Sequence, residues 1–119
     1  MKNNKIIVKS KSKTYPIYIG NGNINIINKL IRKNLPNVKK ICIIVDKNVP
    51  LKIKKKLNKC LSKFDKKIFT LKVNEKIKSF KIANSIAEKI LKDNFNRSDC
   101  VIALGGGIVG DLAAFVASI

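Results

Sequence analysis

The sequence has no histidine and no tryptophan, and only seven of its 119 residues are acidic. Without histidine, and without acidic residues at metal-ligand spacing, these residues cannot assemble a zinc site of the usual kind. The apolar residues form short blocks, none long enough for a membrane span or, near the N-terminus, for a signal peptide. We therefore expect a soluble, cytoplasmic globular protein with no membrane partner.

Cysteine, proline and glycine are also scarce, with three, three and six residues. Cys42, Cys60 and Cys100 are odd in number and widely spaced in apolar or amphipathic segments, which is typical of reduced, packed thiols. No repeat and no Gly/Ser-rich linker divides the chain. The sequence thus predicts one domain over residues 1–119.

Charge of one sign is in contrast abundant, since 26 basic residues give a formal net charge of +19. All but Arg32 and Arg97 are lysine, whereas specific phosphate and base recognition favours arginine. Lysine, asparagine and isoleucine share A/T-rich codons, so genome composition explains the charge at least as well as function. The densest run, Lys52–Lys56 with Lys59, fits the outer face of an amphipathic helix. We expect no specific nucleic-acid partner.

Apolar periodicity and turn residues predict an alternating series of elements. Strands are expected at 5–9, 15–19, 41–45, 67–71 and 99–104, and helices at 23–35, from Pro50 to before Asp65, at 78–94 and at 110–119. The continuous apolar run at 41–45 is typical of a strand buried on both faces. Leu51, Leu57, Leu61 and Phe64 should form the buried stripe of the second helix, and the third helix should bury Phe80, Ala83, Ile86, Ala87, Ile90 and Leu91.

Alternating strands and helices specify a parallel sheet with right-handed crossovers. The predicted fold is therefore α/β, a Rossmann-like parallel sheet with flanking helices and an N-terminal β-hairpin. The last helix is apolar on nearly every side, which predicts that something covers it. We interpret the chain as a domain that is incomplete at its C-terminus.

The segment Leu104–Asp111 is the most informative, because Gly105, Gly107 and Gly110 show the G-x-G-x-x-G spacing between a buried strand and a helix. Glycine lets backbone amides approach a pyrophosphate, and the following helix directs its positive end at the anion. Alternatively, the glycines only make a tight turn, and Asp111 is only a first-turn carboxylate favoured by the helix dipole. The acidic residue expected about 20 positions downstream, which would hold a ribose, lies beyond Ile119.

The segment 97–115 resembles the signature of 3-dehydroquinate synthase, in which a strand, GGG, two aliphatic residues and Gly-Asp-Leu follow one another. Tyr15–Gly20 resembles that family's opening strand, and Val45–Leu51 resembles its second nucleotide-contacting turn. The resemblance implies that NAD is bound. The implied contacts are Asp46, Lys47, Asn48, Glu75, Lys78, Gly105, Gly106, Gly107, Gly110 and Asp111.

The family converts a seven-carbon phosphorylated keto acid of the shikimate pathway into 3-dehydroquinate and phosphate, and it recycles NAD. A divalent metal, zinc or cobalt, is held in the complete enzyme by a glutamate and two histidines of a helical C-terminal domain that is absent here. The resemblance therefore implies an isolated chain that is catalytically silent. It needs that missing domain or a complementing chain, and a homodimer is a further option.

Three alternatives remain at this point. A related sugar-phosphate cyclase shares the glycine signature, and a glycerol-dehydrogenase-like enzyme shares the architecture but usually has serine after GGG. A third alternative is a non-catalytic basic remnant that binds nucleotides or RNA. Salt-sensitive RNA binding without NAD binding would favour the remnant.

Overall fold

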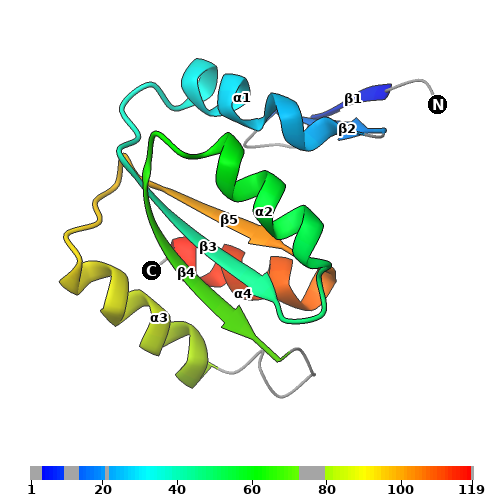
Figure 1. Ribbon diagram of the computed structural model, residues 1–119. Coiled ribbons are helices and arrows are strands. Elements are labelled where there is room, and N and C mark those ends of the chain that lie inside the picture. Colours follow the sequence, from blue (N-terminus) through cyan, green and yellow to red (C-terminus); the bar gives the residue numbers. More distant parts are fainter. Residues whose placement is uncertain (1–3, 10–13, 21, 73–79, 119) are drawn as a thin grey trace.

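The computed structural model describes residues 4–9, 14–20, 22–72 and 80–118 (Figure 1). Its strands are β1 (Asn4–Lys9), β2 (Thr14–Ile19), β3 (Lys40–Asp46), β4 (Asp65–Leu71) and β5 (Cys100–Leu104). Its helices are the 3₁₀ turn η1 (Asn23–Ile26), α1 (Ile27–Asn34), α2 (Leu51–Cys60), α3 (Phe80–Lys92) and α4 (Gly107–Ser118). The predicted α/β class and the order of elements are confirmed.

The three later strands form a parallel sheet in the order β4-β3-β5. The central strand β3 has five consecutive buried residues from Ile41 to Val45, as its unbroken apolar sequence predicts. Alternate side chains of β3 serve two separate cores. Ile41, Ile43 and Val45 pack under α1 and α2, while Cys42 and Ile44 pack under α3 and α4.

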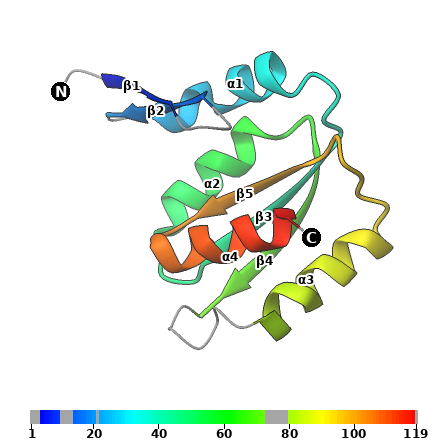
Figure 2. The same cartoon turned by 180° about the vertical axis from the view of Figure 1, so that it is seen from behind.

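Helices therefore cover both faces of the sheet, α1 and α2 on one and α3 and α4 on the other (Figures 1 and 2). The buried thiol of Cys42 lies within the second core. Burial, with a smaller contribution from Cys100, raises the pKa of the Cys42 thiol to about 11. Cys42 is thus a packed thiol as predicted, and Cys60 and Cys100 are free and half-buried.

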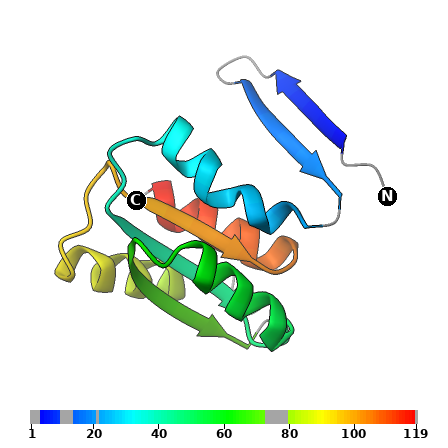
Figure 3. The ribbon, with the colours of Figure 1, turned by 45° about the horizontal axis from the view of Figure 1, so that its top comes forward.

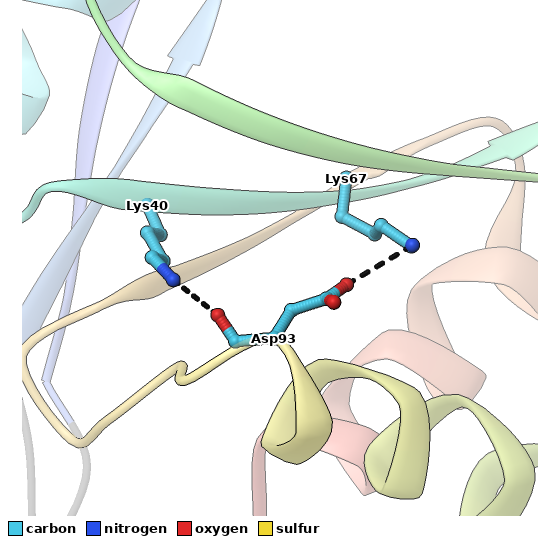
Figure 4. Close-up of polar contacts among 3 residues, drawn as sticks. All are labelled: Lys40, Lys67 and Asp93. Atoms are coloured by element: carbon cyan, nitrogen blue, oxygen red, sulfur yellow. Dashed lines mark hydrogen bonds and ion pairs between the residues drawn. The ribbon is translucent and has the colours of Figure 1, made fainter.

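Two aspartates fasten the amino ends of the parallel strands. The Asp99 carboxylate, just before β5, accepts hydrogen bonds from the backbone N–H groups of Lys40 at 2.9 Å and Lys39 at 3.2 Å, at the start of β3. Asp93, just after α3, pairs with Lys67 of β4 at 3.0 Å, and its backbone carbonyl accepts from the Lys40 ammonium group (Figure 4). These contacts hold α3, and the segments that lead into β3 and β5, at the amino ends of the parallel strands.

The predicted N-terminal hairpin is confirmed, because β1 and β2 pair antiparallel from Asn4↔Ile19 to Lys9↔Thr14. It forms a two-stranded sheet of its own and lies beside the α1 layer, apart from the parallel sheet (Figure 3). Five large apolar side chains of the hairpin are 41–48% exposed, namely Ile6, Ile7, Tyr15, Ile17 and Ile19.

Several predicted details are wrong. The single helix at 23–35 is a 3₁₀ turn followed by α1, because the left-handed Gly22 starts an i→i+3 turn in which the Asn25 N–H donates to the Gly22 carbonyl. Leu51 and Leu91 are 64% and 66% exposed, and each lies at an end of its helix, Leu51 at the start of α2 and Leu91 in the last turn of α3. The last helix begins at Gly107 instead of Gly110, because burying Val109 completely outweighs the low helix propensity of glycine.

Candidate functional site

The candidate site lies where β3 and β5 end side by side. Val45 is paired with Leu104, so Asp46, the last residue of β3, and Gly105, the first residue after β5, lie at the same edge of the sheet. In open α/β sheets, ligands bind in the crevice outside the carboxyl ends of the strands. The structure therefore brings the β3 turn and the glycine segment, 59 residues apart in sequence, to the edge where a ligand is expected.

Gly105 is a glycine for structural reasons. Its φ is +155°, a region that side-chain-bearing residues rarely adopt. A Cβ at this position would lie 3.1 Å from the Asp46 Cβ and 3.1 Å from Val109 Cγ2. The tight-turn interpretation thus explains Gly105, and this residue allows the two loops to touch.

The other three glycines have no such explanation. A Cβ built on Gly106, Gly107 or Gly110 would meet no atom within 4 Å, and none of the three has positive φ. Inside this chain an alanine would fit at each, and within α4 alanine is the better helix former. The bare backbone therefore leaves open space at the start of α4, as a closely approaching ligand requires.

The start of α4 supplies the electrostatics of this space. The helix begins at Gly107, and the Gly110 N–H already donates to the Gly106 carbonyl at 3.1 Å. The positive end of the helix macrodipole, about half a charge, is directed at the glycine segment. Asp111 is the fifth residue of α4 and is exposed, so the alternative that treats it as a first-turn carboxylate is wrong.

The β3 turn positions the second half of the site. One Asp46 side-chain oxygen accepts the Asn48 N–H at 2.8 Å, which forms an Asx turn, and the Val49 N–H donates to the Asp46 carbonyl at 3.1 Å, which forms a β-turn. The Lys47 N–H donates to the Leu71 carbonyl at 2.8 Å, which ties this turn to the end of β4. The Lys54 ammonium group of α2 donates to the Lys47 carbonyl at 3.1 Å.

Eight of the ten predicted NAD contacts are thus placed at one edge of the sheet, in the β3 turn and the glycine segment. The remaining two, Glu75 and Lys78, lie outside the described residues. Among the residues that are described, no group of three His, Cys, Asp or Glu could hold a metal ion. No helix in the described ranges is long and apolar enough to cross a membrane.

Sequence reasoning missed one relationship, the contact between Asp46 and Gly105. It sought the acidic partner of the glycines about 20 residues downstream, as in the usual order of the dinucleotide fold. In this structure the carboxylate follows the neighbouring strand β3, which comes earlier in the chain. The signal was an aspartate directly after a fully apolar strand, because parallel neighbours end at the same edge.

Comparison with solved structures identifies the class. Two crystal structures of 2-deoxy-scyllo-inosose synthase match 98% of this chain with a TM-score of 0.83 at 17% identity, and the chain covers 33% and 31% of them. One is a complex with carbaglucose-6-phosphate, NAD⁺ and Co²⁺. The fold is therefore that of the sugar-phosphate cyclase synthases.

Sequence comparison shows which proteins this chain resembles. The family described as "3-dehydroquinate synthase N-terminal" matches residues 68–119. The 3-dehydroquinate synthases of Pelagibacter ubique and Clostridium beijerinckii are each 38% identical over 114 and 115 residues, and that of Staphylococcus carnosus is 36% identical over 118. Each alignment covers 95–96% of this chain and 31–33% of the relative, so the chain spans about a third of these proteins' length. The resemblance to the N-terminal part of 3-dehydroquinate synthase is thereby confirmed.

Proposed function

We propose that the chain binds NAD at the joined ends of β3 and β5, as the nucleotide-binding part of a cytoplasmic 3-dehydroquinate synthase. The complete enzyme would convert 3-deoxy-D-arabino-heptulosonate 7-phosphate into 3-dehydroquinate and phosphate. The observation that carries the proposal is the glycine segment, in which one glycine is required by packing and three leave space that nothing in the described chain fills.

The residues at this edge suit a dinucleotide. The backbone N–H groups at the start of α4 would face the pyrophosphate, where the helix end favours negative charge. Asp46 would accept hydrogen bonds from ribose hydroxyls, since it lies beside the glycines as the acidic residue of a dinucleotide site does. Lys47, Asn48 and Asp111, with Glu75 and Lys78, are the further proposed contacts.

NAD would supply reversible hydride acceptance, which acidifies a neighbouring C–H and is reversed within one turnover. The residues of this chain contribute binding and orientation to that chemistry. The described residues do not fit the zinc or cobalt ion of the complete enzyme, and the sequence has no histidine, so we assign no metal-dependent step to this chain.

The test is calorimetric titration of NAD⁺ into the wild type and the Asp46→Asn variant. Asparagine keeps an oxygen for the Asn48 N–H but removes the charged acceptor. We expect the wild type to bind and the variant to bind about tenfold more weakly, which corresponds to one charge-assisted hydrogen bond.

Asp65→Asn is the matched control, because Asp65 carries the same charge at the opposite end of the sheet, paired in register with Lys40. Its affinity for NAD⁺ should equal that of the wild type. Absence of binding by the wild type, or equal weakening in both variants, would contradict the proposed site.

A further inference from the structure

Charge is divided unequally between the two helical layers. Residues 20–64, which build η1, α1, β3 and α2, contain twelve basic residues and one acidic residue, Asp46. Residues 80–119, which build α3, β5 and α4, contain four basic and four acidic residues. The two layers lie on opposite faces of the sheet, so nearly all the excess charge of these segments lies on one side (Figures 1 and 2).

On α2 the lysines form one stripe. Lys52, Lys55, Lys56 and Lys59 are exposed and recur at spacings of three and four, while Leu57 is buried against the sheet. Like charges at i and i+4 destabilise a helix. The stripe is therefore unfavourable for the helix unless an anion neutralises it.

The other layer shows that codon composition does not explain this stripe. On α3, Lys81, Lys89 and Lys92 share the exposed surface with Glu88, whose carboxylate accepts from the Asn84 amide at 3.4 Å. The same genome encoded both helices, and amphipathicity asks only for polar residues on the outside. Neither codon composition nor amphipathicity therefore explains why lysine is concentrated on α2.

The positive surface continues across α1 to a hollow at the amino ends of the strands. Lys29, Arg32 and Lys33 are exposed on α1. The hollow measures about 480 Å³, and its lining includes Arg32, Lys39, Lys63, one acidic residue, Asp65, and the half-buried Phe64. We call the whole surface the basic face. It comprises Lys29, Arg32, Lys33, Lys39, Lys52, Lys55, Lys56, Lys59 and Lys63.

We propose that the basic face binds single-stranded nucleic acid through its phosphodiester backbone, without sequence preference. The α2 stripe offers a cation about every 5.4 Å, one per helical turn, along a line that a strand of phosphates can follow. A purely lysine stripe supplies the sequence-independent electrostatic contribution to binding. Phe64 lines this mainly basic hollow as well as packing against the core, and an aromatic residue on which a base would stack favours a nucleic acid over an anionic membrane.

The basic face shares no residue with the proposed NAD contacts, although its Lys55 lines a hollow with Val45 and Leu104, which precede Asp46 and Gly105. Lys54, the α2 lysine that contacts the β3 turn, is not part of the basic face. Loss of nucleic-acid binding and loss of NAD binding can therefore be observed independently, and either proposal can fail without the other.

The test measures binding of a fluorescein-labelled oligouridylate by anisotropy over a range of salt concentrations, in the full chain. The variant K55Q/K56Q/K59Q removes three stripe lysines. Its control, K81Q/K92Q/R97Q, removes three exposed charges from the other layer and leaves the same net charge. We expect the stripe variant to reduce the slope of log K against log salt by about 2, at about 0.7 per phosphate contact, and the control to retain the wild-type slope.

Equal loss of slope in both variants would mean that net charge alone drives binding, and it would overturn the proposal. So would a wild type that binds phosphatidylserine vesicles but not the oligonucleotide. Urea unfolding of the stripe variant checks that a lower slope is not caused by loss of the fold. Its unfolding midpoint should rise above that of the wild type, because repulsion between the lysines of α2 is relieved.

Discussion

Gly105 is the residue on which the contact between the two loops of the site depends. Its backbone conformation is one that residues with side chains rarely adopt, and a Cβ would lie tightly against Asp46 and Val109, at 3.1 Å from each. The three nearby glycines satisfy neither condition. At the scale of single residues, one glycine therefore has a folding role, and three have the role that we propose for ligand approach.

Gly105→Ala should lower the free energy of unfolding by about 1–3 kcal/mol, the range for a side-chain-bearing residue in a glycine-only conformation. Urea unfolding followed by circular dichroism measures this change. Gly106→Ala is the control, because its Cβ would meet no atom within 4 Å, and its midpoint should match that of the wild type. Equal effects of the two substitutions would contradict this assignment.

Asp99 has a comparable structural role, although it belongs to the segment that resembles the family signature. Partial desolvation raises the pKa of its carboxyl group, but hydrogen bonds from the N–H groups of Asn96, Lys40 and Lys39, with the charge of Lys40, lower the pKa by more. A carboxyl whose pKa is lower in the folded state stabilises the fold above its unfolded pKa. That stabilisation is lost as the pH falls through the folded pKa.

The difference in stability between the wild type and Asp99→Asn should consequently depend on pH. We expect the wild type to be the more stable above about pH 5 and the difference to shrink below about pH 4, as Asp99 becomes protonated. Urea midpoints of both proteins across this range provide the measurement. A difference that stays constant with pH would show that the charge of Asp99 is not what fastens β3 to β5.

At the scale of elements, α4 contains residues that stabilise it and residues that weaken it. Its buried residues Val109, Leu112, Ala113 and Val116 anchor it to the sheet, but its first turn contains two glycines. Glycine weakens a helix, so its presence there is better explained by what the helix start approaches than by the stability of the helix.

Gly110→Ala should therefore stabilise the fold and weaken NAD binding together. We expect a gain of about 0.5–1 kcal/mol in the free energy of unfolding, from the better helix propensity of alanine. Paired urea unfolding and NAD⁺ titration measure both quantities. A stabilised variant with unchanged NAD⁺ affinity would remove Gly110 from the proposed contacts.

At the scale of the whole molecule, the chain presents half of the chemistry that the proposed reaction needs. It spans about a third of the 3-dehydroquinate synthases that it matches. The edge at which we propose that NAD binds is formed, whereas the described residues contain no group of residues that could hold a metal ion. The large apolar Phe115 of α4 is 41% exposed, so the described residues do not cover every side of this helix, as expected from its sequence.

The isolated chain of 119 residues should accordingly release no phosphate from the heptulosonate substrate, with or without added Zn²⁺ or Co²⁺. A continuous phosphate assay tests this, with a full-length relative as the positive control. Metal-dependent phosphate release by the purified chain would show that our assignment of the metal chemistry to other residues is wrong.

The sequence by itself determined the class of fold and the order of its elements, because apolar periodicity and turn residues are local signals. The five-residue apolar run of β3 predicted a strand buried on both faces, and the glycine spacing located the segment that we propose to bind the nucleotide. Helix boundaries were less well determined. The start of α4, where Val109 is completely buried, and the exposure of Leu51 depend on tertiary packing, which no local pattern records.

Only the tertiary structure decided which distant residues meet. The order β4-β3-β5 places Asp46 against Gly105, and it separates a lysine-rich layer from a balanced one on opposite faces of the sheet. Strand order and crossover direction are set by packing between residues far apart in the chain. The residues of the candidate site could therefore be predicted from the sequence. Only the fold shows that Asp46 lies beside the glycine segment and on which face of the sheet the excess positive charge lies.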